Sequence, residues 1–227
     1  KTFLKKKKIK FFTGVPDSIL KNLSLYLENF SIKKHIIAAN EGAAVSVGIG
    51  YYLSRKKIPC VYFQNSGLGN AINPLISIAH KEVYSIPLLL IIGWRGSPNQ
   101  PDEPQHKAKG KITKNLLQLL KVKHCVLKSE KDLLKLKNLI KISYREKRIV
   151  ACLIEKNSLK IKKVKKKNKI DFSLLRSDFI EKLLSLIPKN SKIISSTGYT
   201  SRELMQIRKN KKKTKGKDFY MVGGMGH

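Results

Sequence analysis

The sequence predicts an α/β protein built on a doubly wound parallel sheet, followed by the start of a second α/β domain. Three observations support this prediction: apolar, strand-like runs alternate with helix-like runs, helices separate successive strands, and polar or glycine-rich turns follow the strands. Strands separated by helices imply right-handed crossovers and therefore a parallel sheet covered on both faces. With 227 residues, the chain is long enough for one or two such domains.

The first domain, residues 1–155, is predicted from ten alternating segments. A helix over 17–30 follows Pro16 and carries four Ile and Leu side chains on one face. The segments 58–64 and 86–92 are continuously apolar, as buried strands are. Further predicted elements are the strands 34–39, 124–127 and 148–155, the small-residue helix 42–55, and the helices 68–80, 113–120 and 131–146.

A lysine-rich stretch, residues 156–170, has no hydrophobic periodicity and is predicted to be a linker. A second α/β domain, 171–227, then begins. Its predicted elements are a helix over 173–186, a strand over 192–196, a helix over 200–209 and a strand over 218–222. Because the chain starts at Lys rather than Met and stops on a glycine turn where a helix is due, we expect both ends to be cut.

The net charge of +33 invites a nucleic-acid interpretation, since neutralising phosphates drives non-specific binding. Nearly all of the basic residues are lysine, however, whereas base-reading and bidentate phosphate sites favour arginine. The lysine runs 5–8, 162–169 and 209–217 also lack interleaved aromatic residues on which bases stack. We therefore expect mostly solvated surface charge and no specific nucleic-acid partner.

Apolar runs and cysteines bear on the compartment. No stretch approaches the roughly 20 apolar residues that cross a bilayer, and no cleavable apolar segment follows the basic start. We therefore expect neither a membrane span nor a secretory signal. Cys60, Cys125 and Cys152 lie in apolar runs without metal-binding spacing, which predicts buried free thiols in a reducing cytoplasm.

Glu41 is the most informative single residue. It follows the predicted strand 34–39 and precedes the small-residue helix 42–55, which places it where α/β proteins bind ligands. Partial shelter there makes a carboxylate easier to protonate. The alternative is an ordinary acidic residue in the first turn of a helix, favoured by the macrodipole.

Polar groups also follow the other predicted strands. Gln64 and Asn65 begin a glycine turn into a helix, where amide groups can hold a polar ligand. Arg95 and His106 lie in a polar stretch, 93–111, which we predict to be a long and therefore functional loop. Arg95 suits an anion, although a surface arginine beside a turn and an ordinary histidine remain alternatives. Asp17 is either a substrate-handling residue or a simple helix start.

Seven strings occur in a particular order along the chain. They are Thr13-Gly14-Val15-Pro16-Asp17-Ser18, Ala38-Ala39-Asn40-Glu41-Gly42, Gln64-Asn65-Ser66-Gly67-Leu68-Gly69-Asn70, Gly93-Trp94-Arg95-Gly96, Asp102-Glu103-Pro104-Gln105-His106, Ser196-Thr197-Gly198-Tyr199-Thr200-Ser201-Arg202-Glu203-Leu204 and Gly223-Gly224-Met225-Gly226-His227. Together they closely resemble the phosphonopyruvate decarboxylases, which are thiamine-diphosphate-dependent enzymes. The related sulfopyruvate decarboxylases are the hardest alternative to separate, since both substrates carry tetrahedral anions.

The resemblance implies that the first domain binds the cofactor's pyrimidine and that Glu41 hydrogen-bonds its ring nitrogen N1′. It also implies an imino tautomer that removes the thiazolium C2 proton, so that the cofactor acts as electron sink for a 2-oxo acid carrying a phosphonate. The expected substrate-handling residues are Asp17, Arg95 and His106. The expected cofactor-binding residues are Glu41, Gln64, Asn65, Thr197, Gly198, Gly223, Met225, Gly226 and His227.

One departure from the family pattern concerns magnesium. These enzymes bind Mg²⁺ and diphosphate through a Gly-Asp-Gly motif downstream of the 223–227 turn, and the sequence stops before it. We therefore assign no metal ligand and expect little or no decarboxylase activity from these residues alone. The resemblance further implies a homo-oligomer with its active site at a subunit interface. A basic nucleic-acid-binding protein and a remnant retained as an interaction subunit are the alternatives from other functional classes.

Overall fold

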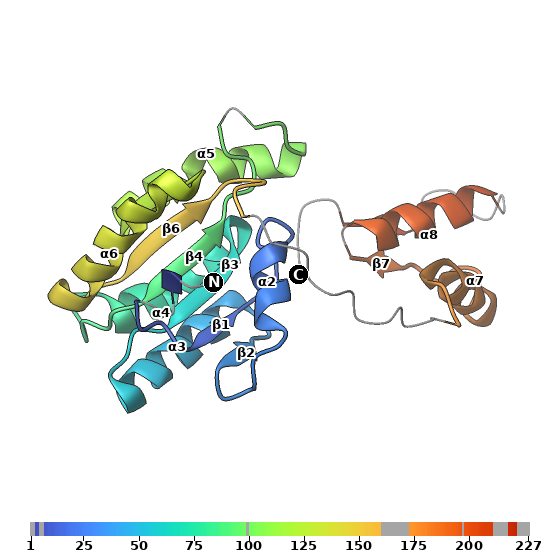
Figure 1. The fold of residues 1–227 in the computed structure, drawn as a ribbon. Helices are drawn as coiled ribbons and strands as arrows, with labels where there is room; N and C mark the ends of the chain where they lie inside the picture. Colours follow the sequence, from blue (N-terminus) through green and yellow to red (C-terminus); the bar gives the residue numbers. More distant parts are fainter. Residues whose placement is uncertain are drawn as a thin grey trace. The chain divides into compact units, whose positions relative to one another are not determined.

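The computed structural model describes residues 3–4, 7–98, 100–159, 173–196, 198–210 and 218–221. The chain divides into two compact units, Lys1–Lys162 and Lys163–His227. The predicted linker lies mostly outside the described residues. Each unit is an α/β structure in its own right (Figure 1).

The first unit contains a six-stranded sheet in the order β2-β1-β3-β4-β6-β5. Every neighbouring pair of strands is parallel, which confirms the predicted sheet type. The strands are β1 (Phe12–Gly14), β2 (His35–Ile37), β3 (Cys60–Gln64), β4 (Leu89–Gly93), β5 (Lys123–Leu127) and β6 (Val150–Ile154). All residues of β3, β4 and β6 are buried, as the continuous apolar runs predict.

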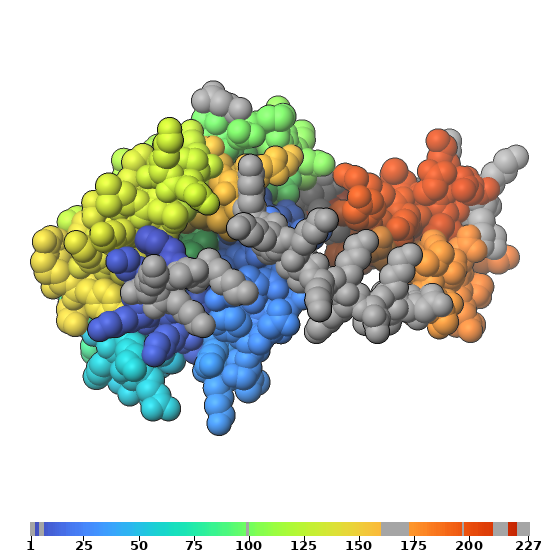
Figure 2. Space-filling model, viewed as in Figure 1, coloured from blue at the N-terminus to red at the C-terminus, as the bar shows by residue number. Residues whose placement is uncertain are grey.

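Helices cover both faces of this sheet. They are α2 (Lys21–Leu27), α3 (Glu41–Arg55), α4 (Leu68–Pro74), α5 (Pro104–Leu119) and α6 (Leu133–Glu146). One core lies between the sheet and α3, α4 and α5, and a second lies under α2 and α6. Alternate residues of β3 serve the two cores, with Val61 and Phe63 in the first and Cys60 and Tyr62 in the second. The space-filling view shows α6 in yellow and the α2 region in blue on the second face (Figure 2).

Two segments differ from the sequence prediction. The long loop over 93–111 is wrong in its second half, because α5 already begins at Pro104, nine residues before the predicted start. Proline suits the first turn of a helix, where its missing N–H has no partner to lose. The strand β1 was not predicted, since it has only three residues and follows a run of lysines.

Smaller differences have local causes. The predicted helix over 17–30 begins only at Lys21, because the Asp17 carboxylate accepts the Ile19 and Leu20 N–H groups and holds them in a turn. After α4 the helix widens into a π-helical turn, Leu75–Ala79, directly behind Pro74, which has no N–H to donate. The helix α6 is preceded by a short 3₁₀ turn, Glu130–Asp132.

The second unit contains α7 (Arg176–Leu186), β7 (Ile194–Ser195), α8 (Tyr199–Asn210) and β8 (Phe219–Tyr220). The two strands pair in parallel, and Ile180, Leu204 and Ile207 form a small core. All four predicted elements are therefore present, with shorter strands than expected. The boundaries predicted for the two domains remain an expectation.

The cysteines and the helices can be compared with the remaining sequence predictions. All three cysteines are free; Cys60 and Cys152 are buried, whereas Cys125 is only partly buried. Cys125 lies on the edge strand β5, which explains its greater exposure. Among the described residues, no helix combines the length and apolar character that a membrane span requires.

Candidate active site

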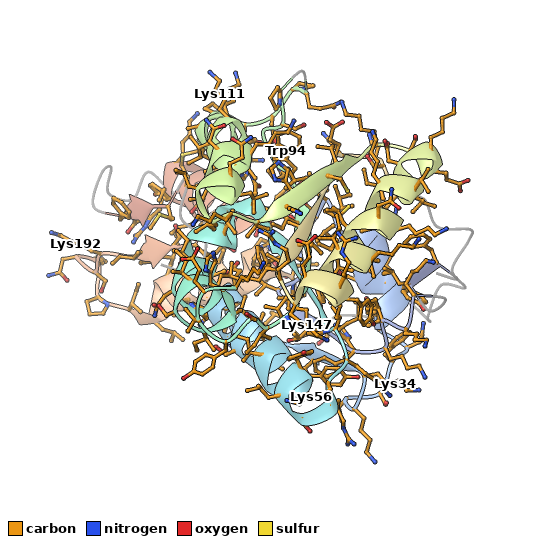
Figure 3. All side chains as sticks on the ribbon, turned by 90° about the vertical axis from the view of Figure 1, so that its left-hand side faces the viewer. Lys34, Lys56, Trp94, Lys111, Lys147 and Lys192 are labelled. Carbon is orange, nitrogen blue, oxygen red and sulfur yellow. The ribbon has the colours of Figure 1, made fainter. Side chains whose placement is uncertain are left out.

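The polar side chains predicted at strand ends gather at one edge of the first unit. All strands of the sheet run in the same direction, so the segments that follow them emerge at their common carboxyl edge. Figure 3 shows Trp94, directly after β4, at one end of the sheet, and Lys56, which lies before β3, toward the other. The candidate site lies at the Trp94 end.

Glu41 opens α3 and is 8% exposed. The Asn40 side chain caps this helix by accepting the Ala43 N–H at 2.9 Å, which fixes where the helix starts. The Asn70 amide on α4 donates to Glu41 Oε2 at 3.0 Å. Among the described residues, no hydrogen bond reaches Oε1. The Glu41 carboxylate is therefore sheltered and accepts a hydrogen bond at Oε2, while Oε1 accepts none from the described residues.

Gly67 makes room for this carboxylate. A Cβ at position 67 would lie 2.1 Å from both Cδ and Oε1 of Glu41, so any side chain there would displace the carboxylate. The glycine turn between β3 and α4, which the sequence marked as a ligand-holding turn, thus lies directly against Glu41.

Gln64 and Asn65 turn out to be engaged within the protein. Gln64 donates to Ser66 Oγ at 2.7 Å. Asn65 accepts the Arg95 N–H at 3.0 Å and donates to the Arg95 carbonyl at 3.0 Å and to Thr113 Oγ1 at 2.9 Å. Both amide hydrogens of Asn65 are therefore used. These bonds tie the end of β3 to the end of β4 and to α5, and the expectation that Asn65 holds the cofactor stays a prediction.

Arg95 forms a two-pronged ion pair with Asp102. Its Nε donates to Asp102 Oδ2 at 2.8 Å, its Nη2 donates to Oδ1, and its Nη1 donates to Ser18 Oγ at 3.2 Å. Asp102 also accepts the N–H groups of Gly96 and Glu103. The hydrogen bond from Arg95 holds the pKa of Asp102 far below its usual value, and the same bond raises the pKa of Arg95.

Asp17 lies beside this ion pair, against the end of β4. Its Oδ2 accepts two backbone N–H groups, whereas Oδ1 is buried and has no hydrogen-bond partner among the residues that the structure describes. A Cβ on Gly93 would lie 2.2 Å from Oδ2, so the glycine lets the carboxyl group pack onto the strand end. Burial raises the pKa of Asp17, and the Arg95 charge only partly offsets that effect.

His106 lies in the first turn of α5, and its buried Nδ1 atom has no hydrogen-bond partner within the described part of the chain. Burial lowers the pKa of His106, with a further lowering by the charge of Arg95. Gly96 holds this turn close: it has φ +65°, and a Cβ there would lie 1.9 Å from the His106 carbonyl oxygen. The three predicted substrate residues, Asp17, Arg95 and His106, are therefore brought together.

Of the predicted residues in the second unit, the structure describes Gly198. It has φ +88°, a conformation that favours glycine, and a Cβ there would meet no atom within 4 Å. The other predicted cofactor residues of this unit, Thr197, Gly223, Met225, Gly226 and His227, lie outside the described residues. No cluster of three or more metal-ligating side chains occurs in the part of the chain that the structure describes.

Sequence reasoning missed three contributors: Gly67, Asn70 and Asp102. All three lie within the strings quoted above, but their roles depend on contacts between elements far apart in sequence. Asn70, for example, reaches Glu41 across 29 residues. Of the three, only Asp102 had a signal in the sequence, because it stands with Glu103 and His106 in one short string. That string does not show that Asp102 pairs with Arg95.

Comparisons with known proteins agree with this fold. Residues 2–119 match the family described as "Thiamine pyrophosphate enzyme, N-terminal TPP binding domain". A benzoylformate decarboxylase from Polynucleobacter necessarius has a similar structure, with a TM-score of 0.51 and 16% identity over 88% of this chain and 38% of that one. At this identity the likeness concerns the fold alone.

Two relatives are closer in sequence. "Phosphonopyruvate decarboxylase" of Streptomyces viridochromogenes is 30% identical over 230 residues, 94% of this chain and 56% of the relative. "Sulfopyruvate decarboxylase subunit alpha" of Methanococcus maripaludis is 33% identical over 148 residues, 65% of this chain and 86% of the relative. The chain spans about half the length of the phosphonopyruvate decarboxylases that it matches.

Proposed function

The chain belongs to the thiamine pyrophosphate enzyme family, and on that premise we propose that its protein decarboxylates a 2-oxo acid bearing a tetrahedral acid group. The proposed substrate is 3-phosphonopyruvate, and the products are phosphonoacetaldehyde and CO₂. The named relative that aligns with 94% of this chain supports that choice. The observation that carries the proposal is the sheltered Glu41 carboxylate at the carboxyl edge of the sheet.

Glu41 fits the group that the family implies. Its carboxylate is nearly buried, its Oε2 is held by Asn70, and Gly67 leaves the space that the carboxylate needs. Such a carboxylate can accept a hydrogen bond from a protonated ring nitrogen, and Glu41 would hold N1′ of the aminopyrimidine in this way. When bound, thiamine diphosphate supplies a carbon nucleophile for the ketone and a sink for the electron pair released with CO₂.

Arg95, Asp17 and His106 would handle the substrate. Arg95 provides a planar cation for the tetrahedral acid group. The Asp17 carboxyl, whose pKa is raised by burial, can hold a proton at a pH where an exposed carboxylate has lost it. His106, whose pKa is lowered, is neutral and can accept a proton at Nδ1 or Nε2.

For the diphosphate end of the cofactor we keep the residues of the second unit as part of the proposal: Thr197, Gly198, Gly223, Met225, Gly226 and His227. Mg²⁺ would accompany the diphosphate, and no described residue is assigned to it. We further propose a homo-oligomer with its site at a subunit interface. A cytoplasmic location is in keeping with three free cysteines.

Sulfopyruvate is the second candidate substrate. The observation that supports it is that the sulfopyruvate decarboxylase subunit alpha of Methanococcus maripaludis aligns with this chain over 86% of its own length. Sulfonate and phosphonate are both tetrahedral anions that the same donors bind, so direct competition between the two substrates is the decisive comparison.

The test is decarboxylation by the protein that carries this sequence, supplied with thiamine diphosphate and Mg²⁺. Phosphonopyruvate and sulfopyruvate are offered separately, and aldehyde formation is followed by NMR. We expect turnover of phosphonopyruvate and a loss of at least about 100-fold in kcat for Glu41→Gln. Glu155→Gln is the matched control, because Glu155 is also 8% exposed and instead pairs with Lys128. Turnover that survives Glu41→Gln contradicts the proposal.

A further inference from the structure

Arg95 is fixed at both ends of the residue. At the backbone, Asn65 pairs with its N–H and its carbonyl, and also reaches Thr113 on α5. At the guanidinium group, Nε and Nη2 donate hydrogen bonds to Asp102, and Nη1 donates one to Ser18. An exposed arginine ordinarily samples many rotamers, and all of that freedom is lost when it binds a ligand. Here the conformation is already selected.

The hydrogen inventory shows what remains available. A guanidinium group has five N–H hydrogens. Asp102 uses one on Nε and one on Nη2, and Ser18 uses one on Nη1. In the hydrogen bonds of the described residues, one hydrogen therefore remains on each terminal nitrogen, and 22% of the side chain is exposed. Asp102 thus occupies the Nε–Nη2 edge of the guanidinium group, and each terminal nitrogen keeps one N–H that can donate to a ligand.

Asp102 is itself held rigidly. Besides Arg95 it accepts the backbone N–H of Gly96 at 2.8 Å and of Glu103 at 2.9 Å, and its side chain is only 9% exposed. The turn at Gly96 is packed against α5, where a Cβ on Gly110 would lie 1.7 Å from the Gly96 carbonyl oxygen. The carboxylate is therefore anchored to the same scaffold as the Arg95 backbone.

We propose that Asp102 is a positioning residue that aims the two remaining N–H groups of Arg95 at the tetrahedral acid group of the substrate. The proposal rests on the proposed function for the nature of that substrate, but not on the cofactor chemistry. The affinity for the ligand is higher because the entropy cost of ordering the Arg95 side chain is paid before the ligand binds.

The direction in which Asp102→Asn changes anion affinity distinguishes this positioning role from simple charge attraction. Asp102 puts a negative charge beside the cation, so by Coulomb attraction alone Asp102→Asn strengthens the binding of any anion. Positioning predicts the opposite, because Asn cannot accept both prongs of the fork and Arg95 is released. We expect about tenfold weaker binding of a tetrahedral anion, as for the loss of one charge-assisted hydrogen bond.

The chain carries its own probe for this measurement. Trp94 is its single tryptophan, is 3% exposed, and donates from Nε1 to the Gly110 carbonyl at 2.9 Å. It directly precedes Arg95, so its fluorescence reports on the turn that holds the fork. The 227-residue chain is titrated with methylphosphonate, and with acetate as a planar anion, at about 0.15 M ionic strength to screen the general lysine charge. Calorimetry measures the same affinities independently.

The second unit offers a matched control. Arg208 and Asp218 form the same kind of pair, with Nε to Oδ2 at 2.8 Å and Nη2 to Oδ1 at 3.2 Å. Asp218→Asn therefore makes the same change in charge and removes the same kind of two-point contact in a pair that does not include Arg95, and it is expected to leave methylphosphonate affinity unchanged. Arg95→Lys keeps the positive charge but lacks the fork, and it is expected to bind as weakly as Asp102→Asn.

Chemical rescue guards against a simple folding defect. In Arg95→Ala the Asp102 carboxylate stays in place through Gly96 and Glu103, so added guanidinium ion can dock onto it and restore methylphosphonate binding. The double variant Arg95→Ala, Asp102→Asn lacks that dock, and no rescue is expected. Rescue confined to the single variant supports positioning even where Asp102→Asn disturbs the turn.

Three results overturn the proposal: no methylphosphonate binding by the unaltered chain, equal or tighter binding by Asp102→Asn, or guanidinium rescue that is the same with and without Asp102. The proposed function is judged separately, by Glu41-dependent decarboxylation. Methylphosphonate binding that follows the pattern above in a protein without that decarboxylation removes the function and leaves the positioning role standing.

Discussion

Glu41 and Asp102 are both sheltered carboxylates at the carboxyl edge of the first unit, but they make different hydrogen bonds. Glu41 is 8% exposed, and the Asp102 side chain is 9% exposed. Within the described residues, Glu41 accepts one hydrogen bond, from Asn70, whereas Asp102 accepts four, two of them from Arg95. Burial alone therefore does not distinguish a carboxylate whose hydrogen-bonding capacity is filled from one that retains some. Among the described residues, both oxygens of Asp102 accept hydrogen bonds, whereas only Oε2 of Glu41 does.

The strongest way to break this contrast is to close the space over Glu41. Gly67→Ala places a Cβ 2.1 Å from the carboxylate, so Glu41 must move out of position. We expect a loss of at least about 100-fold in kcat, as for removal of an acid–base group, and a destabilisation of about 1–3 kcal/mol from overpacking. Steady-state kinetics and thermal unfolding measure the two effects.

Gly69 supplies the control for that substitution. It lies two residues further on, in α4, and a Cβ there would meet nothing within 4 Å. Gly69→Ala is therefore expected to leave kcat unchanged and to stabilise the helix by up to about 1 kcal/mol. Equal kinetic effects at both glycines would show that the space over Glu41 is not the cause.

A milder change tests whether the single partner of Glu41 matters. Asn70→Ala removes the 3.0 Å hydrogen bond to Oε2 and leaves the carboxylate free to rotate. We expect kcat to fall about tenfold, since a hydrogen bond to a charged group contributes about 1.5–3 kcal/mol. Asn73→Ala is the control on the same helix, because the Asn73 amide oxygen instead accepts the Ser77 hydroxyl. If Asn70→Ala keeps full activity, Glu41 needs no positioning partner.

The same contrast explains how far the sequence could be read. Glu41 was predictable, because a strand pattern ends beside it and a helix pattern begins. The parallel sheet was predictable for the same reason. The early start of α5 was not, because residues 104–112 are mostly polar and the helix there is held by packing of Gly110 against Gly96. Nor was the role of Asn65, since its partners lie 30 and 48 residues away. Contacts across strands leave no periodic trace in one sequence.

A final and smaller effect concerns pH and the third carboxyl of this edge, Asp17. Its pKa is raised by burial in the folded chain, so between the unfolded value, about 3.9, and the folded value the native state binds more protons than the unfolded one. Its contribution to stability is therefore fully present below that window and is lost as pH rises through the folded pKa. The pH dependence of Asp102 runs in the opposite direction, because Arg95 lowers its pKa and its contribution to stability is lost as the pH falls.

Asp17→Asn can still accept the two backbone N–H groups but does not titrate. We expect the difference in unfolding free energy between the unaltered chain and Asp17→Asn to move in favour of Asp17→Asn as pH rises from below 4, measured by urea unfolding at each pH. If that difference instead favours the unaltered chain at the higher pH, the buried Asp17 oxygen has a partner that stabilises its charged form, and the contrast with Asp102 disappears.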